Sequence, residues 1–191
     1  MRLRFALPED AATLLEIYRP YVERTTITFE TETPSPDAFR GRILDISSRY
    51  PYLVLEQEGR ILGYAYAHPF HERAAFHWTA ETTVYVAWAH RGKGYGAILY
   101  RGLLGLLEAM GVETACALVT IPNEPSIGFH LATGFTLEGS LPHMGYKLGS
   151  WCGLAYLCRP LAQAQTPEFQ PISAISPEQR EKIFREAMEN P

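Results

Sequence analysis

The sequence has few cysteines and no cysteine pattern. Its three cysteines, Cys116, Cys152 and Cys158, are odd in number and widely spaced. This arrangement argues against a disulfide framework and does not match the spacing of zinc ligands. It is typical of a chain that stays in a reducing cytosol, where these side chains serve as core or surface thiols.

Long apolar runs and an excess of basic residues are also missing. No apolar run is long enough to span a membrane, and the first residues, MRLRFALPED, lack the apolar region of a signal peptide. The net charge of −4 gives no indication of a nucleic-acid partner. The 191 residues, 47% of them hydrophobic, suit one domain with a sizeable core. We therefore expect a cytoplasmic protein without membrane or nucleic-acid partners.

The periodicity of the apolar residues predicts an α/β domain with the element order β-α-α-β-β-β-α-β-α-β-β. Three of the strands are expected to form an antiparallel meander. Predicted strands cover residues 2–6, a hairpin over 52–67 with a Glu58-Gly59 turn, 77–87, 113–121, 135–149 and 150–160. Predicted helices cover residues 8–23, 36–50 after a Ser35 N-cap, the stretch that ends near Met110, and 126–132.

The composition changes after residue 161. Residues 162–175 are polar and contain proline, which is typical of a linker. Ser176-Pro177-Glu178-Gln179 then supplies the start of a further helix. We expect a core domain over residues 1–161, a linker over 162–175, and a helical tail over 176–191 outside the core domain.

A glycine-rich stretch, HRGKGYGAILY, lies directly before the helix that ends near Met110. Glycine allows unusual backbone dihedrals and close approach of a ligand, and a helix start attracts anions, phosphate above all. The stretch lacks the Gly-Lys-Ser/Thr end of a P-loop and the G-x-G-x-x-G spacing of a dinucleotide fingerprint. From the glycines alone, a simple turn and an anion site remain open alternatives.

Glu81 lies within the otherwise apolar and hydroxyl-bearing strand that precedes this loop. Partial burial would raise the pKa of its carboxyl, which would suit a general base. Strand alternation equally permits a solvent-facing glutamate. The strand beyond Glu81 spans roughly 20–25 Å at ~3.3 Å per residue, which is about the reach of a pantetheine arm. This distance points to coenzyme A, with its thioester near Glu81.

Several motifs together resemble a known family. Arg91-Gly92-Lys93-Gly94-Tyr95-Gly96 resembles the R/Q-x-x-G-x-G/A signature of the GNAT superfamily of acyl-CoA N-acyltransferases, and the element order matches that fold from about Arg2 to Pro160. Asn123, Ser126 and HLATGF resemble its second motif. The segments TITFETE, GYAYAHPF, HWTAETTVYV, NEPSIGFHLATGF and GYKLGSW are similar to the phosphinothricin and methionine sulfoximine N-acetyltransferases.

This resemblance implies acetyl-CoA as co-substrate and assigns roles to individual residues. Glu81 matches the general base of the family, and His130 matches a histidine that assists catalysis. A donor at His130 could protonate the departing thiolate, whereas the alternative is a helix residue that only packs. The residues implied in holding coenzyme A are Arg91, Gly92, Gly94, Tyr95, Gly96 and Ala97 for the pyrophosphate, and Val84 and Val86 for the pantetheine amides. Asn123 would contact the pantetheine or a structural water, and Ser126 belongs to the same cofactor-binding set.

On the acceptor side, Arg73 aligns with an arginine that binds a carboxylate, although an ordinary exposed loop arginine remains an alternative. Phe76 departs from a tyrosine of the phosphinothricin-specific enzymes, which puts that substrate in doubt. Phe29 and Glu30 are expected to wall the amine pocket. His68, His71, His77 and Glu72 lack the H-E-x-x-H order, so we expect no metal.

The sequence therefore predicts an acetyl-CoA-dependent N-acetyltransferase that acts on a small amino-acid-like amine by direct attack in a ternary complex. A homodimer is implied by the resemblance. Two alternatives remain open: a protein N-terminal acetyltransferase with the same fold, and a non-catalytic acyl-CoA sensor.

Overall fold

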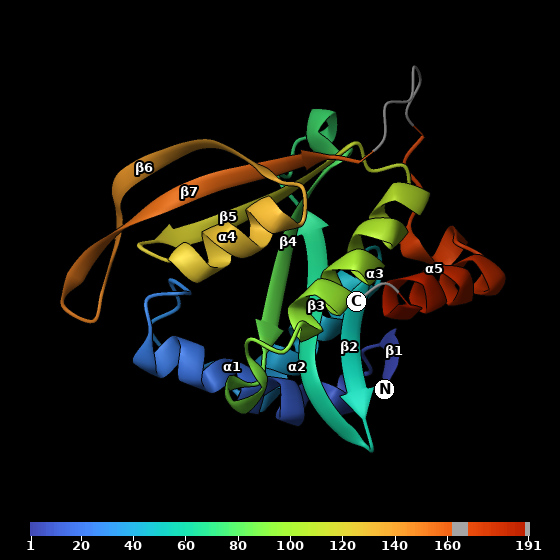
Figure 1. The fold of residues 1–191 in the computed structure, drawn as a ribbon, viewed down its shortest axis with the longest axis horizontal. Coiled ribbons are helices and arrows are strands. Elements are labelled where there is room, and N and C mark those ends of the chain that lie inside the picture. Colours follow the sequence, from blue (N-terminus) through green and yellow to red (C-terminus); the bar gives the residue numbers. More distant parts are fainter. Residues whose placement is uncertain (162–167, 190–191) are drawn as a thin grey trace.

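A single mixed sheet forms the centre of the protein (Figure 1). The computed structural model describes residues 1–161 and 168–189. Within them the seven strands take the order β1-β2-β3-β4-β5-β7-β6, and β4 and β5 form the parallel pair in an otherwise antiparallel sheet. The strands are β1 (Arg2–Phe5), β2 (Tyr52–Gln57), β3 (Arg60–Pro69), β4 (Thr79–Val86), β5 (Thr114–Ile121), β6 (Thr136–Lys147) and β7 (Ser150–Pro160).

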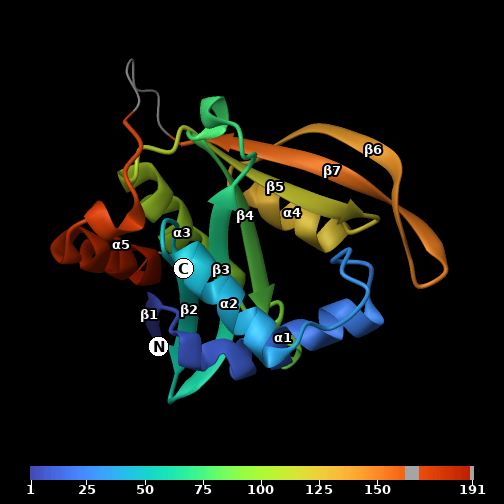
Figure 2. The ribbon, with the colours of Figure 1, turned by 180° about the vertical axis from the view of Figure 1, so that it is seen from behind.

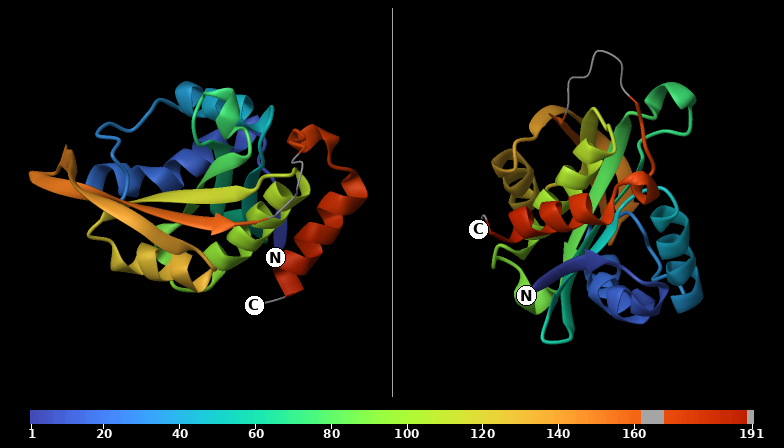
Figure 3. Two further views of the ribbon diagram at one scale, coloured as in Figure 1. Left: turned by 90° about the horizontal axis from the view of Figure 1, so that it is seen from above. Right: turned by 90° about the vertical axis from the view of Figure 1, so that its right-hand side faces the viewer.

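Helices cover both faces of the sheet (Figures 2 and 3). The helices are α1 (Ala11–Arg24), α2 (Pro36–Ser47), α3 (Tyr95–Ala109), α4 (Glu124–Ala132) and α5 (Pro177–Glu189). On β2, Tyr52 and Val54 belong to a core with α1 and α2, whereas Leu53 and Leu55 belong to a core with α3. Because successive strand residues face opposite sides, this run of buried residues requires cover on both faces. The predicted element order and α/β class are confirmed.

Local sequence signals set most element boundaries. The Ser35 side chain accepts a hydrogen bond from the Ala38 amide and so caps α2, as predicted. Glu58 and Gly59 both have positive φ, which is the geometry of a tight two-residue hairpin turn.

Three helix boundaries differ from the prediction. Residues 8–10 form a 3₁₀ turn, and α1 begins at Ala11. The second helix ends at Ser47, ahead of Pro51, and α4 begins two residues earlier than expected. Proline is tolerated in the first helical turn, and therefore Pro125 fits inside the start of α4.

The feature that positions the site is a fork between β4 and β5. Each strand has eight residues, yet only Thr79, Ala80 and Glu81 of β4 pair with β5, opposite Thr114–Cys116. Beyond Glu81 the two strands diverge (Figure 1). β4 remains paired with β3 along its whole length, and β5 remains paired with β7. The fork therefore leaves a gap between β4 and β5, while each of these strands keeps its pairing with its other neighbour.

The C-terminal helix packs against the core domain, whereas the sequence predicts that it lies outside that domain. Helix α5 lies beside α3 and β1 (Figure 3), and Ile172, Ile175 and Ala187 are buried within the α3 core. The Arg101 guanidinium donates to the Ala187 carbonyl at 3.0 Å. Within the predicted linker, residues 162–167 lie outside the described residues, and the Gln170 amide bonds to Met110. A few apolar residues on one helix face drive this packing, and the polar composition of the segment concealed them.

None of the helices among the described residues has the length and apolar content to cross a bilayer. Cys116, Cys152 and Cys158 are free thiols.

Candidate active site

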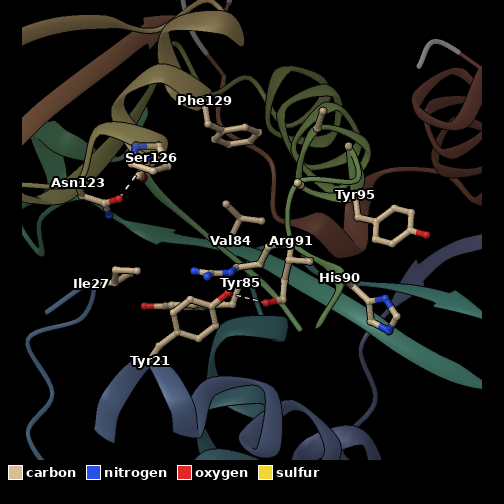
Figure 4. A pocket seen from close by; sticks show the side chains of 16 residues that line it. Tyr21, Ile27, Val84, Tyr85, His90, Arg91, Tyr95, Asn123, Ser126 and Phe129 are labelled. Atoms are coloured by element: carbon tan, nitrogen blue, oxygen red, sulfur yellow. Dashed lines mark hydrogen bonds between the residues drawn. The ribbon is translucent and has the colours of Figure 1, made fainter. Parts of the chain in front are cut away.

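Two adjoining pockets occupy the fork. The glycine-loop pocket, about 360 Å³, lies between β4, the start of α3 and α4 (Figure 4). The Glu81 pocket, about 310 Å³, lies between β3, β4, β5 and the loop after α1. The two share their boundary residues, namely Ile27, Val84, Tyr85, Asn123 and Ser126. One continuous cleft therefore runs from the glycine loop to Glu81.

The glycine loop forms an anion site at the start of α3. Gly92 and Gly94 have φ of 73° and 79°, a left-handed conformation that favours glycine, and Gly94 is the N-cap of the helix. A helix start presents N–H groups without helical partners and the positive end of the dipole. The Ala97 amide is an exception, because it bonds to the Gly94 carbonyl at 3.0 Å. The N–H groups of Tyr95 and Gly96 in the first turn suit a pyrophosphate.

All the residues predicted to hold coenzyme A line this pocket. They are Val84, Val86, Arg91, Gly92, Gly94, Tyr95, Gly96, Ala97, Asn123 and Ser126. The Arg91 guanidinium lies 3.4 Å from the centre of the Trp88 ring, which fixes a cation at the pocket edge. The Asn123 side chain accepts from the Ser126 amide at 3.3 Å and so caps α4 (Figure 4).

The inner edge of β4 offers backbone groups to the cleft. The Ala87 amide donates to Leu62 of β3 at 2.8 Å. Because successive residues in a strand direct their N–H groups to opposite edges, those of Val84 and Val86 point into the fork. The Tyr21 hydroxyl donates to the Val86 carbonyl at 2.5 Å on the same edge (Figure 4). This edge fits the amides of a pantetheine arm.

Glu81 is a largely buried carboxyl in the second pocket. Its side chain is 24% exposed, and burial raises the pKa of the Glu81 carboxyl, while the nearby His68 ring opposes part of that shift. His68 Nε2 lies 3.8 Å from Glu81 Oε1, and the two residues are direct partners in the β3–β4 register. A carboxyl with a raised pKa at the end of a cleft is suited to act as a general base.

His130 lies in a buried hydrogen-bond network at the wall of the Glu81 pocket. It is 4% exposed, its Nδ1 lies 2.7 Å from the Ser126 carbonyl, and its Nε2 lies 2.9 Å from the Tyr100 hydroxyl. A carbonyl accepts only, so Nδ1 carries the proton and Nε2 accepts from Tyr100. Burial lowers the pKa of His130, which favours this neutral form. Thr82 Oγ1 lies 2.7 Å from the Tyr100 hydroxyl and extends the network to β4.

The loop after α1 forms one wall of the Glu81 pocket. Phe29 and Glu30, which are expected on the acceptor side, both line this pocket. Glu30 forms an ion pair with Arg42 of α2 at 2.6 Å. Lys147, at the end of β6 and 4% exposed, donates to the Thr28 carbonyl at 2.8 Å. Phe29 lies where a Cβ on Gly145 would be, 2.6 Å from the nearest ring carbon. The β6 end therefore holds this loop over the cleft.

Arg73 and Phe76 lie in the exposed loop between β3 and β4, and neither lines the two pockets. The Phe76 ring contacts Phe70 and His71 instead, with ring centres 6.0 and 5.1 Å apart. The structure therefore does not bring these two predicted residues together with Glu81.

Sequence reasoning missed several residues that line the Glu81 pocket. Tyr66 and His68 lie on β3 opposite Thr83 and Glu81. The alternation of YAYAH in the sequence could have placed both on one face, but the register that brings them to Glu81 was needed as well. No cluster of three or more His, Cys, Asp or Glu side chains suited to a metal ion occurs among the described residues.

Taken together, a parallel strand pair that forks beside a glycine loop, with a buried carboxyl at the far end, defines an acyl-coenzyme A transferase site. The acetyltransferase (GNAT) domain family matches residues 3–153. The chain belongs to this family of N-acetyltransferases, whose members take an acetyl group from acetyl-CoA. The family, the fold and the donor predicted from the sequence are confirmed.

The chain is also similar to individual members of the family. It is 36% identical to phosphinothricin N-acetyltransferase of Streptomyces viridochromogenes, over 92% of this chain and 96% of that protein. It is 32% identical to L-methionine sulfoximine/L-methionine sulfone acetyltransferase of Salmonella typhimurium, over 88% and 99%. A phosphinothricin acetyltransferase from Sinorhizobium meliloti in complex with AcCoA superposes with a TM-score of 0.83, at 34% identity over 92% and 95% of the two chains.

Proposed function

We propose that the protein transfers the acetyl group of acetyl-CoA to the amine of a small amino-acid-like substrate, such as phosphinothricin, methionine sulfoximine or a related amino acid. The observation that carries this proposal is the end of the cleft away from the glycine loop. The glycine loop suits the pyrophosphate, and Glu81 lies at the opposite end in a pocket of about 310 Å³, a size that suits a small acceptor. The names of the relatives point to the same class of acceptor.

The proposed mechanism is direct attack within a ternary complex. Glu81 takes a proton from the acceptor ammonium, directly or through water, and the amine then attacks the thioester carbonyl. A backbone N–H of Val84 or Val86, which points into the fork, stabilises the developing oxyanion. His130 supports this geometry through Tyr100 and Thr82 and thus acts as a positioning residue. Arg73 and Phe76 would contact the acceptor only after the exposed loop closes over the pocket.

The test is a panel of amino acids, sulfoximines and peptides with free N-termini, scored by release of the coenzyme A thiol and by mass of the product. We expect acetylation of one or more free amino acids or sulfoximines. Acetylation of the peptides alone would support the alternative of a protein N-terminal acetyltransferase. Binding of acetyl-CoA without transfer to any amine would support a non-catalytic sensor, against which the buried Glu81 carboxyl argues.

A homodimer that acts in the cytoplasm is also part of the proposal. The small, odd number of cysteines suits a reducing compartment. The β6–β7 hairpin exposes a group of large apolar side chains, which a second copy of the chain could cover: Leu137, Leu141, Met144, Tyr146, Leu148 and Trp151. Light scattering on a sizing column should give twice the mass of one chain. Trp151→Glu should shift the protein to a monomer, and a monomeric wild type would contradict the proposal.

A further inference from the structure

His68 is a histidine in the Glu81 pocket to which the family resemblance assigns no role. It lies at the end of β3, directly opposite Glu81 of β4 in the antiparallel register. Both side chains are partly buried, at 34% and 24% exposure, and both line the pocket proposed for the acceptor. The position of His68 therefore allows contact with the acceptor amine from which Glu81 is proposed to take a proton.

The hydrogen bond on the other side of the His68 ring involves Nδ1 and leaves Nε2 directed toward Glu81. His68 Nδ1 lies 3.0 Å from the Pro69 carbonyl oxygen. A carbonyl oxygen only accepts, so this contact requires a proton on Nδ1. In the neutral ring with this proton, Nε2 carries a lone pair, and it is Nε2 that faces Glu81 Oε1.

When the ring is neutral and Glu81 is ionised, two acceptor atoms face each other across 3.8 Å. This distance is beyond a direct hydrogen bond, and neither a carboxylate oxygen nor an Nε2 lone pair supplies a proton to the other. Two converging acceptors fit one donor group with several N–H bonds, which is the chemistry of an alkylammonium ion. The titratable groups that line this pocket beside His68 are Tyr18 of α1, Glu30 of the following loop, Tyr66 of β3, Glu81 and Tyr85 of β4, and His130 of α4.

The proton balance of acyl transfer provides one proton for each of the two acceptors, Glu81 and His68. An ammonium nitrogen with three protons becomes an amide nitrogen with one, so it must release two protons. The first leaves before the N–C bond forms, and the second leaves once that bond has formed. The C–S bond then breaks, one of the two protons goes to the departing thiolate, and the other goes to solvent.

We infer that His68 Nε2 is a second proton acceptor for the acceptor amine, paired with Glu81 across the acceptor site. Glu81 takes the proton that frees the amine lone pair. His68 binds the same nitrogen and takes the proton released after attack, and its more exposed position lets it pass that proton to solvent. This inference rests on the proposed function, because it requires an amine in the Glu81 pocket.

The test compares His68→Ala with His77→Ala in the full chain. His77 belongs to the same connection between β3 and β4, but it does not line either pocket of the cleft. For an amine that the wild type acetylates, His68→Ala should lower kcat/KM roughly 10²-fold, which is the lower end for proton transfer by a positioned side chain. His77→Ala should stay near the wild-type value. Binding of acetyl-CoA should be unchanged in both variants.

Added imidazole separates proton transfer from a structural role. Removal of the ring leaves room for imidazole, which should restore part of the lost rate of His68→Ala in a saturable manner and should not affect His77→Ala. Wild-type kcat/KM in His68→Ala would overturn the inference. So would a loss that imidazole does not restore, because that outcome makes His68 a structural residue. If the wild type binds acetyl-CoA and acetylates no amine, the proposed function itself fails, and this inference fails with it.

Discussion

The ammonium of Lys147 lies 2.8 Å from the carbonyl oxygen of Thr28, and it joins the end of β6 to the loop that walls the acceptor pocket. It also lies 3.5 Å from the Tyr21 carbonyl in the last turn of α1, where a cation is favoured. Burial lowers the pKa of Lys147, so the charge is held at this position against an unfavourable environment. The loop conformation therefore depends on a residue more than a hundred positions away in the sequence.

Lys147→Met should loosen this loop and raise KM for the acceptor amine. A hydrogen bond to a charged group contributes about 1.5–3 kcal/mol, so we expect an increase of roughly 10-fold or more. KM for acetyl-CoA should change little, since the glycine loop lies at the other end of the cleft. The matched control is Lys182→Met, because Lys182 is 66% exposed on α5. Equal effects on the two substrates would show that Lys147 supports the fold rather than the acceptor pocket.

Gly94→Asp should abolish stabilisation by acetyl-CoA. The wild type should show a higher melting temperature with acetyl-CoA, because the ligand binds only the folded state. Aspartate would place negative charge at the pyrophosphate site and would be strained at the φ of 79°. Thermal unfolding with and without acetyl-CoA measures the difference. An unchanged shift in the variant would remove the pyrophosphate from this loop.

Glu81→Gln should lower turnover by roughly 10²–10⁴-fold, which is the usual contribution of general acid–base catalysis. Binding of acetyl-CoA should persist, since the change lies at the reactive end of the cleft. Burial raises the pKa of Glu81, so the wild-type rate should rise with pH above the ordinary range of a glutamate. This limb should be lost in the variant. Near-native rates across that pH range would rule out Glu81 as the base.

The same pKa shift has a consequence for stability. Between the ordinary pKa of a glutamate and the raised pKa of Glu81, the folded state binds more protons than the unfolded state. The free energy of unfolding should therefore decline as pH rises through this window. Glu81→Gln should lack this decline. Urea unfolding of both proteins at a series of pH values tests the difference, and parallel curves would contradict the shift.

Arg73→Ala distinguishes two roles of the exposed loop. If the loop closes and the guanidinium binds a substrate carboxylate, the variant should lose roughly 10–150-fold in kcat/KM for an amino acid, from a contribution of about 1.5–3 kcal/mol. The corresponding amino acid amide should be affected little, because it lacks the carboxylate. Steady-state kinetics with the acid and the amide give the answer. Equal losses would mean that Arg73 supports the loop.

Ala187→Asp should destabilise the whole domain. Ala187 is 2% exposed and packs with the α3 core, so aspartate would bury a charge at that interface. We expect a loss of about 2 kcal/mol or more in the free energy of unfolding. Glu189→Ala, at an exposed position of the same helix, should have little effect. An aspartate variant as stable as the wild type would show that α5 is dispensable.

Much of the fold could be predicted because its signals are local. The Ser35 cap, the Glu58-Gly59 turn and the apolar periods each depend on neighbouring residues. The docking of α5 could not be predicted in this way. The apolar face of α5 packs against α3 at Gly105, where a Cβ would come within 2.9 Å of Ile183. Neither segment alone predicts this contact.

The residues of the site likewise divide into those whose relation follows from sequence spacing and those whose relation does not. The glycine loop and Glu81 lie on consecutive elements, so their relation follows from sequence spacing. His68 and Lys147 reach the cleft through strand register and loop packing, which spacing does not report. His130 was found by its motif, but its hydrogen bond to Tyr100 connects α4 to α3 and needed coordinates.

Beyond the fork, the facing edges of β4 and β5 have no strand paired with them among the described residues, and the cleft occupies this gap. If a pantetheine arm occupies that place, the co-substrate becomes a temporary part of the sheet. Strand β4 would then contain two classes of amide. Amides directed toward β3 would be protected from hydrogen exchange in every folded state, whereas those of Val84 and Val86 would be protected only while the donor is bound. Alternate residues of one strand would thus report separately on folding and on occupancy of the cleft.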